Sequence, residues 1–113
     1  MDGQPVTIQA AVALHQAGVW DRAAEAYAQI LTTDPQNADA LHLTGVIAHQ
    51  RGKYEEAIQW IQRALELRPQ NAIFHNNLGN ALQAVRRYNA AEQHFQTALK
   101  ISPQSVDARF NLG

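Results

Sequence analysis

The sequence predicts an all-α protein, a solenoid of antiparallel helix pairs, and three observations lead to this fold class. First, Pro35, Pro69 and Pro103 stand 34 residues apart. Second, the same interval aligns other residues, among them Gly45 with Gly79, Tyr54 with Tyr88, and Ala23 with Ala57 and Ala91. Third, each interval carries two segments whose apolar residues have helical spacing. One such unit cannot bury its apolar face alone, so stacked neighbours must share a core.

The second unit shows how each helix is expected to begin and end. Leu41, Gly45 and Ala48 follow helical spacing, and Gly52 provides a residue that readily closes the helix in left-handed geometry. Tyr54 starts the second helix, and Pro69 ends it because proline disfavours helical geometry at the residue before it. Asparagine or serine side chains at Asn37, Asn71 and Ser105 are placed to cap the following helices. The predicted helices are 5–17, 20–33, 38–51, 54–67, 72–85, 88–101 and 106–113.

Small residues at fixed positions indicate close helix packing. Gly45 and Gly79 allow the first helix of a unit to approach the second, while the column of Tyr27, Ile61 and Phe95 is expected to fill the space between successive hairpins. The predicted core includes Leu41, Ala57, Ile61, Ala64, Leu78, Ala91, Phe95 and Ala98. Arg86 occupies the turn column that Gly18 and Gly52 fill in the earlier units. We therefore expect Arg86 to adopt a costly left-handed conformation.

These residues carry a family resemblance. The stretch from Ala38 to Pro69 resembles a tetratricopeptide repeat, and Phe74 to Pro103 matches the same pattern again. The resemblance divides the chain, 1–113, into one array with units at about 4–37, 38–71 and 72–105 and a truncated fourth unit at 106–113. The family implies a right-handed superhelix whose concave groove is lined by the first helix of every unit.

The charge balance and the composition exclude several function classes. Nine basic and ten acidic residues give a net charge of −1, which creates no field that would steer the chain toward nucleic acid or an anionic membrane. The basic pair Arg86–Arg87 is expected to be solvated surface. The chain has no cysteine, so it has no disulfide or thiolate metal site. Because Met1–Pro5 lacks the start of a secretory signal and the longest apolar run, Ala10–Leu14, cannot span a membrane, a cytoplasmic location is expected.

The candidate chemical groups do not combine into a catalytic or metal site. His42 and His49 are about 10 Å apart along one helix, too far to share an ion without a ligand between them. His75 falls in the packed column of Leu41 and is expected to be partly buried, whereas His94 is expected on the outer surface. The serines flank a turn, and no phosphate-binding loop is present. The sequence therefore predicts no catalytic residue, no metal and no cofactor.

A row of amides marks the first helix of the third unit. Asn76, Asn77 and Asn80 are expected on the face away from the partner helix, although three asparagines cost a helix about 2 kcal/mol relative to alanine. Asn111 repeats the column of Asn77 one unit later. Because an amide both donates and accepts hydrogen bonds, this face suits the backbone of an extended peptide. The predicted peptide-binding residues are Asn76, Asn77, Asn80, Gln83 and Asn111, with His49 at the edge.

The amide face is similar to the superhelical repeats of O-linked N-acetylglucosamine transferases, in which a column of asparagines holds the substrate peptide. Here that column reads Gln9, Leu43, Asn77 and Asn111, so only half of it is present. Another mode of the family, a clamp for acidic chaperone tails, needs basic residues, and this chain has Asn76 and Asp107 in their place. The absence of basic residues at Asn76 and Asp107 therefore argues against an acidic chaperone tail as the partner.

The sequence predicts a protein-interaction module that binds a peptide segment of a partner in the concave groove. One alternative is the amino-terminal, substrate-recruiting part of a longer enzyme such as a glycosyltransferase. Another is a structural array that assembles with itself. The fourth unit stops at Gly113 without a second helix to cover Leu112, so either the natural chain is expected to continue or another copy is expected to dock there. End-to-end association is then expected at high concentration, with Leu112 and nearby Phe95 or Leu99 in the contact.

Overall fold

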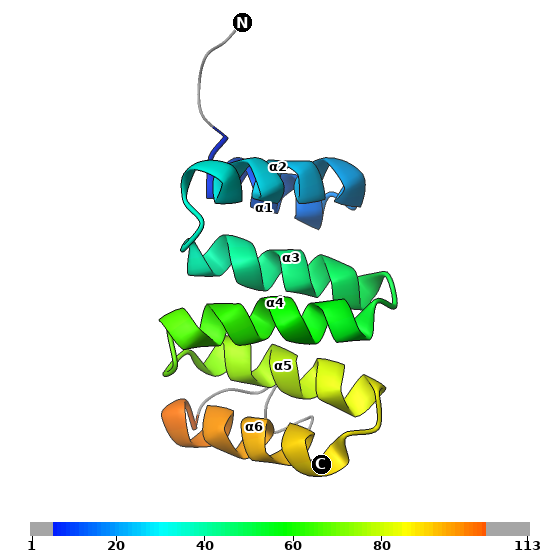
Figure 1. The fold of residues 1–113 in the computed structure, drawn as a ribbon, viewed down its shortest axis with the longest axis vertical. Coiled ribbons are helices and arrows are strands. Elements are labelled where there is room, and N and C mark those ends of the chain that lie inside the picture. Colours follow the sequence, from blue (N-terminus) through cyan, green and yellow to red (C-terminus); the bar gives the residue numbers. More distant parts are fainter. Residues whose placement is uncertain (1–5, 104–113) are drawn as a thin grey trace, which may run out of the picture.

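The computed structural model describes residues 6–103, which form six helices joined by short turns (Figure 1). Consecutive helices pair, and the pairs stack on one another in chain order. No strand occurs within this described range. The chain therefore has the predicted all-α helical repeat fold; the expected helix at 106–113 lies outside the described residues. The helices are α1 (Ile8–Gln16), α2 (Trp20–Thr33), α3 (Ala38–Gln50), α4 (Tyr54–Leu67), α5 (Ala72–Ala84) and α6 (Tyr88–Ile101).

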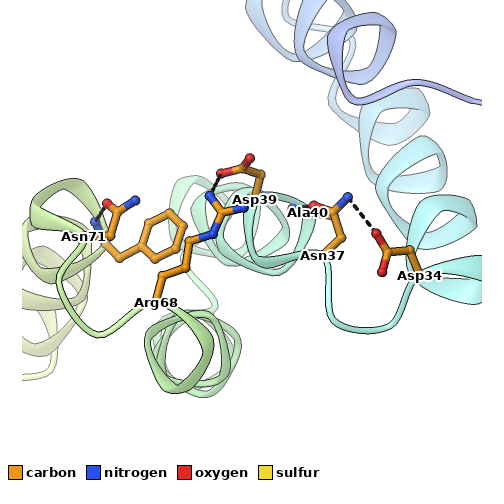
Figure 2. A network of polar contacts seen from close by, with 7 residues as sticks. Asp34, Asn37, Asp39, Ala40, Arg68 and Asn71 are labelled. Carbon is orange, nitrogen blue, oxygen red and sulfur yellow. Dashed lines mark hydrogen bonds and ion pairs between the residues drawn. The ribbon is translucent and has the colours of Figure 1, made fainter.

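Side chains of Thr and Asn start the first helix of each pair. The Asn37 side chain accepts a hydrogen bond from Ala40 N, and Asn71 accepts one from Phe74 N (Figure 2). These are the predicted caps, and each satisfies one of the backbone N–H groups that a helix start leaves without a partner. The first helix begins at Ile8, later than its predicted start at residue 5. The reason is that Thr7 has extended backbone geometry and caps the helix itself.

Polar contacts also tie the turns between units to neighbouring helices (Figure 2). Arg68, which follows α4, forms a salt bridge of 3.5 Å with Asp39 in the first turn of α3. At the previous junction Asn37 donates to Asp34 at 3.3 Å. Both partners of the Arg68–Asp39 pair are about half exposed, so this pair stabilises the fold by at most ~1 kcal/mol. The packing of apolar side chains must therefore supply most of the stability.

The turn within each pair has the same left-handed geometry in all three units. Gly18 and Gly52 have φ values of 80° and 78°, and Arg86 has a φ of 66°. The structure thus confirms that Arg86 takes the conformation of the two glycines. The residue after it, Arg87, forms an exposed ion pair with Glu55 at 3.1 Å. The backbone hydrogen bonds that close these turns are Gly18 N to His15 O, Gly52 N to His49 O, and Arg86 N to Gln83 O.

All eight of the predicted core residues are buried. Glycines in the first helices let large residues of the second helices come close. A Cβ atom built on Gly45 would lie only 2.7 Å from Ile61 Cγ1, and one built on Gly79 would lie only 2.5 Å from Phe95 Cε1. Ile61 and Phe95 thus pack against their own hairpin, and not only between hairpins as expected. Phe95 is 3% exposed, so it does not offer the surface that was expected for end-to-end contact.

The buried residues form two clusters that meet at Leu31, one between the first and second units and one between the second and third. This arrangement matches the prediction that neighbouring units share a core. Within residues 6–103, no helix has both the length and the apolar character that crossing a membrane would need.

Candidate functional site

A small pocket lies between α3 and α5, and three of the predicted site residues surround it. Its volume is about 50 Å³, and it is lined by Val46, His49, Ile61, Asn77 and Asn80. Val46 and Ile61 are apolar, whereas Asn77 and Asn80 contribute amides from one face of α5. The fold therefore brings His49 on one unit together with Asn77 and Asn80 on the next, across 28 residues or more of sequence.

Asn77 is joined to the preceding unit by a hydrogen bond. Its Nδ2 donates to His42 Nε2 at 2.8 Å. His42 is only 5% exposed, and its ring stacks on Phe74 with the centroids 4.4 Å apart. The bond fixes the rotamer of Asn77 and uses one of its two amide protons, while the amide oxygen takes no part in it. Asn77 is therefore a link between units as well as a residue of the pocket.

His42 is held in its neutral form by its surroundings. Burial lowers the pKa of His42 to about 4, and the charge of Asp39 opposes this shift only in part. At neutral pH the ring therefore carries one proton. Because Nε2 accepts from Asn77, that proton is on Nδ1. A neutral imidazole can thus serve as a permanent acceptor for the Asn77 amide near pH 7.

The other predicted residues have different environments. Asn76 is 5% exposed, contrary to the expectation that it lies on the exposed face. The reason is that α5 packs against its own partner, α6, and also against α4 and α3 of the preceding unit, so less of its circumference reaches solvent. Asn76 also shares a 34-residue column with His42, which is buried too. Gln83 is exposed near the end of α5, and Asn111 lies outside the described residues.

His49 lies at the edge of the pocket, and its side chain is partly buried. Its ring meets the ring of Tyr54 edge to face, with centroids 5.1 Å apart. Burial lowers the pKa of His49 below its usual value. The imidazole is therefore uncharged at neutral pH, and no charged residue lines this pocket.

A second cluster was missed by the sequence analysis. His75 and His94 lie next to each other, with their Nδ1 atoms 3.0 Å apart. His75 is partly buried as expected, but His94 is also partly buried and does not stand free on the outer surface. The signal in the sequence was that the equivalent positions one unit earlier, Leu41 and Trp60, are both apolar. The pairing itself depends on how α5 and α6 pack.

Comparison with known proteins establishes the relationship of the chain. Residues 8–72 match a family model described as a tetratricopeptide repeat, and residues 72–105 match a second model of that description. The chain belongs to the tetratricopeptide repeat (TPR) family. No curated protein matches the TPR chain in the sequence comparison. The predicted family and the predicted helical repeat fold are thus both confirmed.

Solved structures resemble this TPR chain over most of its length. A mutant of the O-GlcNAc transferase of Thermobaculum terrenum is 30% identical with a TM-score of 0.91; the match covers 93% of this chain and only 20% of the transferase. MamA of Desulfovibrio magneticus RS-1 is 20% identical with a TM-score of 0.84, covering 93% of this chain and 59% of MamA. The first TPR domain of Spaghetti, bound to an HSP90 peptide, is also 20% identical with a TM-score of 0.84, covering 97% and 93%. The last two likenesses show the fold alone.

Proposed function

We propose that this TPR array binds an extended peptide segment of a protein partner over the pocket between α3 and α5. The observation that carries the proposal is the meeting of His49, Asn77 and Asn80 around a pocket with an apolar wall. TPR proteins bind protein or peptide partners, so the family supports the general role. The finer assignment of the surface rests on the pocket and its amides.

The chemistry of the pocket suits a small aliphatic side chain next to an extended backbone. A volume of about 50 Å³ leaves room for a few carbon atoms only, and Val46 and Ile61 offer them apolar contact. The amides of Asn77 and Asn80 can both donate to and accept from the alternating N–H and C=O groups of a peptide. One N–H of the Asn77 amide already donates a hydrogen bond to His42. The Asn77 oxygen therefore serves as the acceptor for a peptide N–H.

The chemistry of the pocket also bears on which peptides bind. Spaghetti holds an HSP90 peptide that includes two consecutive glutamates and a final aspartate. The pocket described here has no Lys or Arg among its lining residues. An acidic tail would give up its hydration without gaining a charged partner at this site. The proposed partner segment is therefore uncharged where it meets the pocket.

A comparative pull-down tests this function. Immobilised wild-type chain, an Asn80→Ala variant and a Gln59→Ala variant are used as baits, and captured proteins are quantified by mass spectrometry. Gln59 is exposed on α4 and does not line the pocket, so it is the matched control. Removal of the Asn80 amide should weaken the binding of the true partner by about tenfold in Kd, equivalent to ~1.4 kcal/mol. Equal capture by all three baits would refute binding at the pocket.

The likeness to the O-GlcNAc transferase supports a second candidate function, in which these repeats recruit substrates for a glycosyltransferase. The chain spans about a fifth of that transferase, so catalysis would need residues that are not part of the matched region. We assign no catalytic role to residues 1–113. The natural reading frame beyond Gly113 decides between the two candidates, because only the second requires a catalytic domain there.

A further inference from the structure

The two histidines of the third unit face each other through ring nitrogens. His75 Nδ1 and His94 Nδ1 are 3.0 Å apart, and the ring planes are inclined by 27°, with centroids separated by 5.3 Å. His75 Nε2 lies 2.8 Å from the carbonyl oxygen of Pro69. Since a carbonyl can only accept, Nε2 carries the proton of His75 and donates it. The Nδ1 lone pair of His75 is therefore directed at His94.

The fold does not require histidines at these positions. One unit earlier the same two columns hold Leu41 and Trp60, which pack in the apolar core between the second and third units. The scaffold is thus built with an apolar pair in one unit and with two imidazoles in the next. The imidazoles also border a pocket of about 350 Å³ that Gln62 and Glu66 line on the α4 side. The third unit thus places two imidazole rings beside an accessible space.

We propose that His75 Nδ1 and His94 Nδ1 chelate a divalent transition-metal ion of tetragonal geometry, with Cu(II) bound most tightly and Ni(II) next. Two nitrogens 3.0 Å apart, each about 2.0 Å from a metal, subtend an angle of about 97° at the ion. This value is near the right angle of square-planar or tetragonal sites and below the tetrahedral angle that Zn²⁺ prefers. Imidazole ligands and the general affinity order also favour Cu(II) over Ni(II).

The surroundings of the pair have the features of a metal-binding histidine. A ligating imidazole usually donates its other N–H to a carbonyl or carboxylate, which fixes the tautomer, and His75 does so to Pro69. Burial and the nearby His75 lower the pKa of His94, so protons compete weakly for its nitrogens at neutral pH. Within residues 6–103 no group of three or more histidine, cysteine or acidic side chains is placed to hold a metal. Water must therefore complete the coordination from the open pocket.

Binding needs no net loss of a proton from the neutral pair. Without metal, His94 Nδ1–H donates to His75 Nδ1. When the ion binds, His94 changes tautomer: Nδ1 loses its proton to solvent, and Nε2 takes one up. Both Nδ1 atoms then present lone pairs to the ion. In acid, protonation of a ligating nitrogen removes a ligand, so affinity must fall.

Calorimetric titration with CuCl₂ alone, and separately with NiCl₂ alone, tests the proposal at neutral pH in a buffer that does not bind metals. The wild-type chain should bind one Cu(II) ion per chain at this site, and electron paramagnetic resonance should show two nitrogen ligands. The double variant His75→Leu, His94→Trp restores the residues of the second unit and should bind at least about tenfold more weakly, since even the loss of an outer hydrogen-bond partner costs metal sites 10–100-fold. The melting temperature of the wild type, but not of the variant, should rise with Cu(II).

Two further variants keep the result interpretable. His94→Gln replaces one imidazole by another polar side chain, so it disturbs folding less than the double variant does. It should still bind Cu(II) more weakly than the wild type, even if the double variant folds poorly. His15→Gln, at a histidine that contacts Tyr27 and Gln50 in another part of the chain, should bind Cu(II) like the wild type. Equal affinity of wild type and His94→Gln, or the loss of binding in His15→Gln alone, would overturn the proposal. In that outcome the pair shares only a hydrogen bond.

Discussion

At the residue scale, Asn77 has two roles, one in the proposed peptide binding and one in the stability of the fold, so a single substitution affects both. It lines the proposed peptide site, and its amide also satisfies a buried imidazole in the preceding unit. The helix propensity of asparagine alone suggests that alanine at this position would leave folding unchanged or improve it. The structure corrects that expectation, because the hydrogen bond to His42 Nε2 would be lost.

Replacement of Asn77 by alanine should therefore reduce the free energy of unfolding. The buried His42 Nε2 would be left without a donor, which costs about 1–3 kcal/mol, and the gain in helix propensity offsets only about 0.6 kcal/mol. Urea unfolding followed by circular dichroism measures the change. Asn80→Ala is the matched comparison, since Asn80 is on the same helix and lines the same pocket. A stability of Asn77→Ala equal to that of Asn80→Ala would contradict the inter-unit role of this bond.

His42 should make the stability of the chain sensitive to acid. Its pKa is about 4 in the folded chain and close to 6.5 when unfolded. Between these values the unfolded state binds a proton and the folded state does not. The contribution is thus present above pH 6.5 and is lost as the pH falls toward 4, with an upper magnitude of about 3 kcal/mol.

The variant His42→Asn tests this pH dependence, because the third unit has Asn76 in the same column. Free energies of unfolding at pH 7.5 and pH 4.5 should differ less in the variant than in the wild type. Burial also lowers the pKa of His49 and of His94, so a smaller difference should remain. An undiminished difference in His42→Asn would show that the imidazole is not the group responsible.

Arg86 gives a prediction about backbone conformation. Its φ of 66° is costly for a residue with a side chain, by roughly 1 kcal/mol, while glycine adopts it freely. Arg86→Gly should therefore leave the melting temperature unchanged or raise it slightly, because the added flexibility of glycine in the unfolded chain offsets part of the gain. Arg87→Gly, at the next residue, should lower it. A clear loss of melting temperature in Arg86→Gly would mean that the arginine side chain stabilises this turn.

At the scale of the helices, contact between glycine and a large residue sets the spacing within each pair. A Cβ atom on Gly79 would lie within 2.9 Å of three ring atoms of Phe95. Because all three of these distances are well below ordinary contact, overpacking in Gly79→Ala should cost about 2–3 kcal/mol, which exceeds the ~1 kcal/mol that alanine gains in helix propensity. Thermal unfolding should show the loss.

A double-variant cycle identifies the cause of that loss. In a chain that already carries Phe95→Leu, the same Gly79→Ala change should cost less, because the smaller side chain leaves room for the methyl group. Ala84→Gly, at the exposed end of α5, shows the effect of helix propensity without a packing contact. Identical costs of Gly79→Ala in both backgrounds would contradict the close approach of α5 and α6.

Helix positions were predictable from the sequence because prolines, glycines and capping asparagines act locally. Asn37, Asn71 and Gly52 determine helix ends within a few residues of chain, and all three behave as expected. The environment of side chains on the inner helices was harder to predict. Asn76 is buried and His94 contacts His75 because of how whole helices pack, and a 34-residue period alone does not specify those contacts.

At the scale of the whole molecule, the stacked units create a pocket whose lining comes from more than one unit. His49 and Val46 come from the second unit, whereas Asn77 and Asn80 come from the third.

We keep the division into units 4–37, 38–71, 72–105 and 106–113 as a proposal, together with end-to-end association through Leu112 or Leu99. Light scattering at increasing concentration tests that association, which predicts a rising average mass; a constant mass at millimolar concentration would contradict it.

The central claim is that a partner peptide lies across α3 and α5. The most direct measurement is a nuclear magnetic resonance titration of the ¹⁵N-labelled chain with a peptide from a recovered partner. We predict that the largest shifts occur at Val46, His49, Asn77 and Asn80, including the side-chain amides, with little change at Gln59 on α4. Shifts concentrated on α2, α4 and α6, with the pocket residues unaffected, would contradict the account.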